Sequence, residues 1–244
     1  MKSSFAKNIL SSTLLPGIEA HAVTTTLKDF VSLELSLFLP TRSLSVHEVK
    51  IASLTAQLLD AGTKKRSKEN LRKILEERGV SVSFSTDQKW LSAHVQCLRE
   101  DVPFVLSLIS EMLEVPAFKQ NEADIIKKRA YADLENAKSQ TGVRATRGLR
   151  KALFSTNHAH WAPSIEEEQK SILKLKASDA VRFHKEEYGR SQGYIVAVGD
   201  VSVKELTEAG TKAFKKLKPK SPVFSPSMNE KKPQEYREII SIPD

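Results

Sequence analysis

The sequence predicts an α+β domain, with a mainly antiparallel β-sheet and helices packed on one of its faces. Two observations predict this class. Segments in which apolar and polar residues alternate come in pairs, and segments with apolar residues three and four positions apart lie between them. Paired strands with helices gathered between them are typical of an antiparallel sheet covered on one side, not of a parallel α/β fold.

The strands follow from alternation and from the residues that bound each segment. Val31, Leu33 and Leu35 share one face of a half-buried strand that starts at Phe30 and stops before Pro40. A weaker strand precedes it, and the polar turn between the two predicts a hairpin. A second hairpin and a last, very apolar strand follow. The predicted strands are 18–25, 30–39, 80–85, 90–98 and 193–198.

The helices follow from three-four spacing and from residues that favour helix ends. The longest carries Ala123, Ile126, Ala130 and Leu134 on one face. A serine is the expected N-cap of two others, since its side chain can accept a bond from a free backbone N–H. The predicted helices are 47–59, 67–79, 101–112, 120–139, 146–154, 177–188 and 203–217.

Composition bounds the organisation of the chain. The 244 residues suit one domain over 1–217, followed by a linker rich in Pro, Ser and Lys over 218–236. Residues 237–244 look like a tail or the start of a following domain. No apolar run reaches the ~18 residues of a membrane span. The N-terminus has no secretory signal pattern, so we expect a cytoplasmic protein.

The net charge of +8 allows a nucleic-acid partner, but acidic residues interleave with most of the basic ones. Solvated helix faces are the better interpretation of the charge, and no aromatic residues are placed to stack bases.

The single cysteine, Cys97, excludes an internal disulfide, and its place in an alternating strand predicts a buried structural thiol. His94 alternates in the same strand and is expected to be a satisfied or solvent-facing histidine. Trp90 is expected to pack in the core or a loop, and Trp161 is left open.

Five segments in a fixed order resemble one domain of the pitrilysin/insulinase zinc peptidases, which include the mitochondrial processing peptidase. The first reads Leu-Thr-Ala-Gln-Leu-Leu-Asp-Ala-Gly-Thr, and the last reads Val-Ala-Val-Gly-Asp-Val. No segment is decisive alone, but together they span most of residues 10–217. The resemblance implies the antiparallel sheet with one helical layer that this family shares. The five segments are 54–63, 77–81, 116–118, 183–188 and 196–201.

The resemblance also implies where a zinc site would lie. Active members carry His-x-x-Glu-His on a helix just before the Gly-Thr pair, with two metal-binding His and a Glu that activates water. The matching positions here hold Ser53, Ala56 and Gln57, which are unsuited to these tasks. The family's third ligand matches Glu135, which without His partners is better read as an ordinary helix carboxylate. We therefore expect no metal, no cofactor and no catalytic residue.

The family contains a non-catalytic half, and the residue pattern of 54–63 resembles that of the first domain of this half. The resemblance thus implies a domain that partners an active zinc-peptidase subunit, or further domains of its own half, to form a peptide-binding chamber. A basic inner face would favour acidic peptides. A scaffold role in a larger complex is the alternative, and exposed apolar surface predicts self-association of the isolated domain.

A peptidase with an atypical metal set is a further alternative. His158 and His160 are the only close histidine pair, and Glu166 is a possible third ligand. The pair lies in an expected loop with no Cys or third His nearby. Histidines that pack in a loop are the preferred interpretation.

Overall fold

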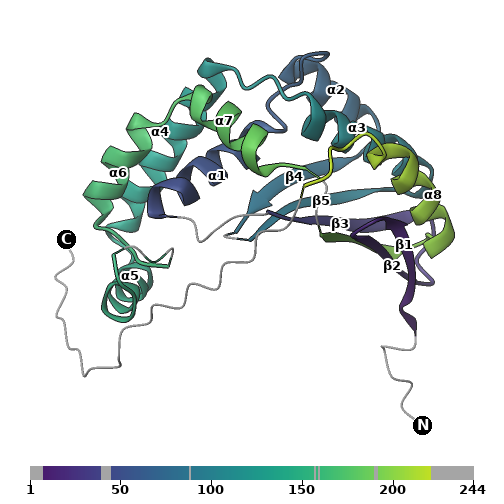
Figure 1. Ribbon diagram of the computed structural model, residues 1–244, viewed down its shortest axis with the longest axis horizontal. Helices are drawn as coiled ribbons and strands as arrows, with labels where there is room; N and C mark the ends of the chain where they lie inside the picture. The colour runs from purple at the N-terminus through teal and green to yellow at the C-terminus, as the bar shows by residue number, and fades with distance from the viewer. Residues whose placement is uncertain are drawn as a thin grey trace, which may run out of the picture.

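A six-stranded sheet lies beneath an arch of helices in the computed structural model, which describes residues 8–39, 45–87, 89–156, 158, 160–189 and 192–220 (Figure 1). The strand order across the sheet is β1-β2-β6-β3-β5-β4, so β1 and β4 are its edges. The strands are β1 (Leu10–Leu15), β2 (Ile18–Thr24), β3 (Phe30–Phe38), β4 (Ser81–Thr86), β5 (Trp90–Leu98) and β6 (Gly193–Gly199).

Eight α-helices occur in the described part of the chain, and seven of them form the arch (Figure 1). Helix α5 lies apart, at the lower left of that view. The helices are α1 (Val46–Leu58), α2 (Lys68–Glu77), α3 (Val102–Glu114), α4 (Gln120–Ala137), α5 (Thr141–Leu153), α6 (Ile165–Lys174), α7 (Ala177–Glu187) and α8 (Val203–Phe214). The predicted α+β class, with helices on one face of a mainly antiparallel sheet, is confirmed.

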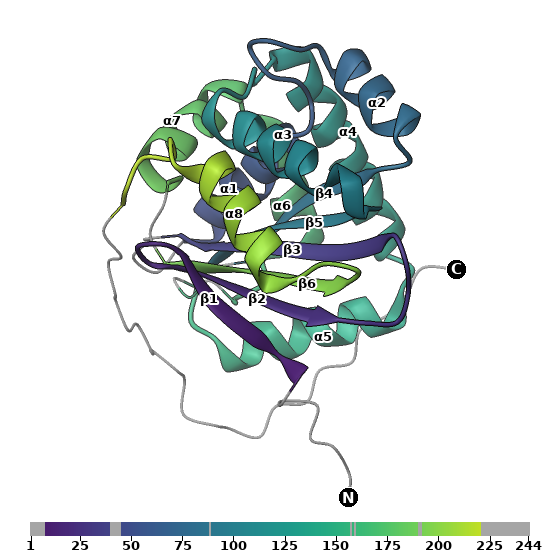
Figure 2. The ribbon, with the colours of Figure 1, turned by 90° about the vertical axis from the view of Figure 1, so that its right-hand side faces the viewer.

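The first predicted hairpin is wrong. Strands β2 and β3 are not neighbours, because β6 lies between them, parallel to β2 and antiparallel to β3. Figure 2 shows β6 in this position. The most apolar strand of the chain thus takes a central place, where both of its edges are paired. The second hairpin is confirmed, with β4 and β5 antiparallel and Phe84 opposite Ala93.

Each central strand buries one face and leaves the other open. On β3, Val31, Leu33 and Leu35 are at most 3% exposed and face the helices. Helices α3 and α8 complete this core with fully buried Leu106, Ile109 and Leu206. The opposite side of β3, β4, β5 and β6, here the open face, carries mostly Ser, Gln, His and Tyr.

Two elements were missed from the sequence, and one began early. Strand β1 does not alternate cleanly, and it pairs with β2 under cover of α8. Helix α6 follows a capping box in which Ser164 and Glu167 bond each other's backbone N–H, a signal that the sequence does contain. Helix α5 starts at Thr141, five residues before the expected 146. The predicted N-caps Ser67 and Ser202 are confirmed.

The predicted domain boundary falls mostly outside the described residues. Leu217 is buried at 6% exposure, and the boundary at 217 stays a prediction. Of the predicted linker 218–236, only 218–220 are described, and the segment 237–244 lies outside them. Within the described residues, no helix has the length and apolar character needed to cross a membrane.

Candidate functional site

Helix α1 carries the positions that match the family's zinc motif. Its N-terminus is fixed by a capping box between Ser45 and Glu48. Ser53 and Gln57 lie one turn apart on the same half-buried face, and the Nε2 of Gln57 donates to the Oγ of Ser53 over 3.2 Å. Ala56 points into the core and is 1% exposed. The motif positions therefore bond each other or pack in the core.

A cavity of about 250 Å³ lies beside Ser53 and Gln57. Helix α1 forms one wall, α4 the second, and α6 with the residue after it the third. We name it the α1–α4–α6 cavity. Its lining residues are Lys50, Ser53, Leu54, Gln57, Ile126, Lys127, Ala130, Asp133, Leu134, Glu168, Ile172 and Leu175.

The cavity is a poor fit for zinc. Zinc sites in proteins are built from Cys, His, Asp and Glu, usually four ligands in a tetrahedron. Here the two helix positions offer a hydroxyl and an amide, and the ammonium groups of Lys50 and Lys127 border the same space. Cations repel a metal ion and bring no lone pair to it. We derive no chemistry through a metal at this place.

Glu135 does not line the cavity. Its carboxylate accepts bonds from the Nε2 of Gln169 at 2.8 Å and the Nζ of Lys138 at 2.9 Å, and these bonds lower its pKa. The α4 carboxylate at the cavity is Asp133. Helical spacing could have indicated this from the sequence, since Asp133 lies seven residues, or about two turns, after the cavity residue Ile126.

A largely buried ion network borders the cavity through Lys50 and Glu168, and sequence reasoning missed it. The carboxylate of Glu168, 7% exposed, pairs with the ammonium of Lys50 and with the guanidinium of Arg147, the latter at 2.6 Å. Burial alone would raise the pKa of Glu168, but Lys50 and Arg147 together lower it. The network joins α1, α5 and α6 through one ionised carboxylate. A sequence contains no local signal for such a contact across 118 residues.

The histidine pair lies against an aromatic ring. The ring of His158 stacks on Phe154 at 4.5 Å and 10°, and the rings of His158 and His160 are 5.4 Å apart. Burial first, and then the neighbouring His158, lower the pKa of His160. Glu166 is exposed and lies 3.8 Å from Lys138. Within the described residues, no group of three or more His, Cys, Asp or Glu side chains could hold a metal ion.

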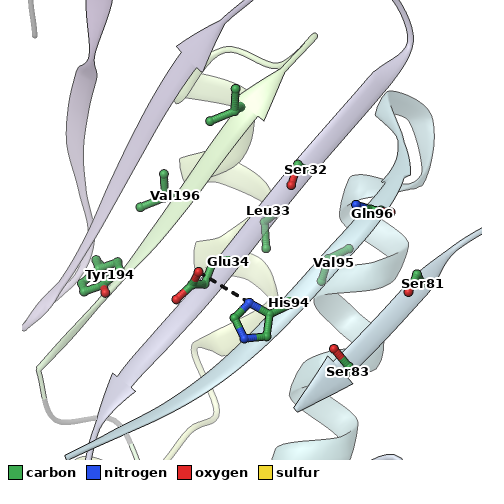
Figure 3. A pocket seen from close by; sticks show the side chains of 11 residues that line it. Ser32, Leu33, Glu34, Ser81, Ser83, His94, Val95, Gln96, Tyr194 and Val196 are labelled. Atoms are coloured by element: carbon green, nitrogen blue, oxygen red, sulfur yellow. Dashed lines mark ion pairs between the residues drawn. The ribbon is translucent and has the colours of Figure 1, made fainter. Parts of the chain in front are cut away.

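The open face of the sheet forms a second hollow, of about 680 Å³ (Figure 3). At its centre His94 on β5 lies 3.5 Å from the carboxylate of Glu34 on β3, and its other ring nitrogen lies 3.0 Å from the Oγ of Ser85. His94 is thus satisfied and half-exposed, as the sequence predicts. No Lys or Arg lines this hollow, so a basic inner face is not found here. Trp90 packs between Phe38 and Tyr194 at one end of the face.

Comparison with known proteins gives a family match and curated relatives. The family described as Insulinase (Peptidase family M16) matches residues 51–162. A protein of Helicobacter pylori described as "Non-peptidase homolog YmxG" is 26% identical over 158 residues, covering 64% of this chain and 36% of its own length. The mitochondrial-processing peptidase subunit beta of Neurospora crassa is 23% identical over 190 residues, covering 75% and 38%.

Solved structures agree on the fold. A structure described as the peptidase M16 inactive domain from Pseudomonas fluorescens superposes with a TM-score of 0.72 at 19% identity, covering 93% of this chain and 54% of that one. The sheet and its helical arch thus form the same fold as that domain. The chain is similar to the insulinase (peptidase family M16) proteins over residues 51–162 and shares the fold of their domains, as the resemblance implied. It spans about a third of the length of the curated relatives it matches.

Proposed function

We propose that this chain is a non-catalytic peptidase-like domain that forms one wall of a peptide-binding chamber with an active zinc-peptidase partner. The observation that carries the proposal is the content of the motif positions on α1: Ser53 and Gln57 bond each other where ligands are needed, and Ala56 is buried. A hydroxyl, an amide and a methyl group supply neither a metal site nor a general base. Relatives described as a non-peptidase homologue and an inactive domain support this reading.

The open face supports the chamber part of the proposal. Helices cover one side of the sheet, so a peptide can reach only the other side and the edges (Figure 1). The hollow on the open face is lined by aliphatic side chains and by hydroxyl, amide, imidazole and carboxylate groups, and these polar groups can bond a peptide backbone. Strand β4 is an edge strand paired with β5 alone, and an extended peptide can add to such an edge.

The lengths of the relatives support the part of the proposal that concerns a partner domain or subunit. The chain covers 54% of the solved inactive-domain structure and less of the curated proteins, so those chains continue well beyond the equivalent of this domain. We infer that a second lobe, from the same chain or from another subunit that carries His-x-x-Glu-His, faces the open face of this domain. Self-association of the isolated domain stays a prediction, supported by exposed Leu149, Leu173 and Val181.

Reconstitution with a His-x-x-Glu-His subunit from the same cell tests the proposal. We expect a stable complex by light scattering, and peptide cleavage that needs both proteins and is lost with a chelator. Placing a cation in the hollow, by Ser83→Arg, is expected to reduce cleavage about tenfold without dissolving the complex. Ser178→Arg, exposed on α7 and outside the hollow, is the matched control.

Three outcomes would count against the proposal. Chelator-sensitive cleavage by this chain alone, lost in His158→Ala, would establish the atypical peptidase instead. A stable complex in which Ser83→Arg does not change the rate of cleavage would favour a scaffold role. Failure to form a complex with any such subunit would contradict the proposed partnership with a zinc peptidase. We also propose that the protein is cytoplasmic. Fractionation of cells that express the tagged full-length protein tests this location.

A further inference from the structure

We propose that the α1–α4–α6 cavity binds a carboxylate attached to an aliphatic group, such as the C-terminal residue of a peptide. The peptide as the source of this group rests on the proposed function. The chemistry of the cavity does not, because a free acylated amino acid presents the same groups. The proposal is argued from the size of the cavity, its apolar wall, its cations and its neutral hydrogen-bonding groups.

The size and the wall select an aliphatic group. At about 250 Å³ the cavity lies just below the ~300 Å³ at which pockets for drug-sized ligands begin, and far above the ~15 Å³ needed by one water. It therefore suits one residue rather than a nucleotide or a large cofactor. No aromatic ring lines it. Half of the lining is aliphatic: Leu54, Ile126, Ala130, Leu134, Ile172 and Leu175.

The cations select a negative charge. Lys50 and Arg147 share the single buried carboxylate of Glu168, so this group of three carries a net positive charge. Lys127 has a side chain only 12% exposed, and its ammonium lies 3.4 Å from Asp124, a carboxylate that is 48% exposed. An ammonium has three donors, and 3.4 Å is long for a hydrogen bond. Both lysines thus keep donors for an anion.

One negative group also lines the cavity. Asp133 would repel a bound carboxylate, but it is an exposed residue on the solvent side of α4, where water and salt screen its charge. Glu168 is the other carboxylate, and two cations already neutralise it. With Arg147 counted beside the lining residues, three cations stand against these two carboxylates, so the balance at the cavity is positive.

The neutral groups fit the rest of a C-terminal residue. The Oγ of Ser53 accepts a bond from Gln57, which leaves the hydroxyl proton of Ser53 free to donate to a carboxylate oxygen. The amide oxygen of Gln57 can accept the N–H of the bound residue. Carboxylate, N–H and aliphatic side chain thus each find a complementary group on α1, α4 or α6.

Methyl NMR of the whole chain tests the proposal with N-acetyl-leucine as the probe and N-acetyl-leucine amide as its uncharged twin. We expect N-acetyl-leucine to shift the methyl signals of Ile126 and Ile172, with a Kd in the millimolar range or tighter, as suits a small ligand. The amide should bind about tenfold more weakly, because charged hydrogen bonds are the stronger ones. Lys127→Met should reduce this difference, because one of the two lysines that face the ligand is lost, whereas Lys128→Met, exposed and outside the cavity, should leave it unchanged.

Equal binding of acid and amide would overturn the proposal, as would shifts confined to methyl groups away from the cavity or no binding at 20-fold the expected Kd. If Lys127→Met loses the dispersed methyl spectrum of a folded protein, Ser53→Ala replaces it and should weaken the acid selectively. A peptide that ends in leucine, compared with its C-terminal amide, then tests the peptide source. Binding of N-acetyl-leucine without binding of the peptide would retain the cavity site and remove only the peptide.

Discussion

Replacing Glu168 by glutamine removes the charge that holds three helices together. In the wild type this carboxylate is 7% exposed and compensates both Lys50 on α1 and Arg147 on α5. The amide of glutamine has nearly the same shape but carries no charge. The variant therefore leaves two cations side by side at the wall of the α1–α4–α6 cavity, with no anion between them.

The expected cost follows from the burial of the partners. Breaking a buried ion pair from one side destabilises by ~3–5 kcal/mol when the remaining charge is fully enclosed. The side chains of Lys50 and Arg147 are 26% and 20% exposed, so water recovers part of this energy. We expect a loss of about 2–3 kcal/mol in the free energy of unfolding. For a domain of this size that corresponds to a fall in Tm of about 5–10 °C.

Urea and thermal unfolding at pH 7 measure the effect, and Glu166→Gln is the matched control. Glu166 is two residues away, 62% exposed and 3.8 Å from its nearest cation, so its loss should change stability by less than about 0.5 kcal/mol. Since the pKa of Glu168 is lowered in the folded state, its contribution is present above the unfolded pKa of ~4.3 and is lost as the pH falls through the folded pKa. A loss at pH 7 no larger than that of Glu166→Gln would refute the reasoning.

Three further predictions concern the backbone, the thiol and the acid limit of stability. Gly199 has φ +141°, and a Cβ there would collide with the β3 backbone, so Gly199→Ala should lower the free energy of unfolding by about 2 kcal/mol or more. A Cβ at Gly142 meets nothing within 4 Å, so the control Gly142→Ala should not destabilise the protein. Equal effects of the two variants in urea unfolding would contradict this prediction. Burial raises the pKa of Cys97 to about 11, so a thiol reagent at pH 8 should label it only in urea; fast labelling of the native chain would show that it is accessible. The hydroxyl and backbone of Ser202 lower the pKa of Glu205 to about 2, so its stabilising effect is present above ~4.3 and is lost toward pH 2. Glu205→Gln should cost about 1 kcal/mol at pH 7 and little at pH 2, because the side chain is 45% exposed, and an equal cost at both pH values would contradict the assignment.

The sequence was a good guide to elements whose signal is local. Alternation located β3, β4, β5 and β6 within a residue or two, and serine caps located the starts of α2 and α8. Prediction from the sequence failed where the local signal is weak or was overlooked. Strand β1 lacks alternation and is stabilised by its neighbours, and the capping box of α6 was present but was not used.

The features of the candidate site likewise divide into those that local sequence predicts and those that it does not. That Ser53 and Gln57 share one face of a helix follows from their spacing of four, and that they are poor metal ligands follows from their chemistry. That Asp133 shares a face of α4 with Ile126 also follows from spacing, but that this face borders the cavity needed the placement of α4 against α1 and α6. The network of Lys50, Arg147 and Glu168 needed three helices to be placed in space.

The sequence by itself determined the class of fold, the resemblance to a peptidase family and the content of the motif positions, because residue chemistry and short-range periodicity are properties of neighbours along the chain. Only the tertiary structure decided that β6 separates β2 from β3, that no Lys or Arg is among the described residues lining the hollow of the open face, and that a cavity with two lysines lies beside the motif positions. The physical reason is that each of these features joins segments more than 60 residues apart. Their pairing depends on which buried surfaces fit together, and no local pattern records that fit.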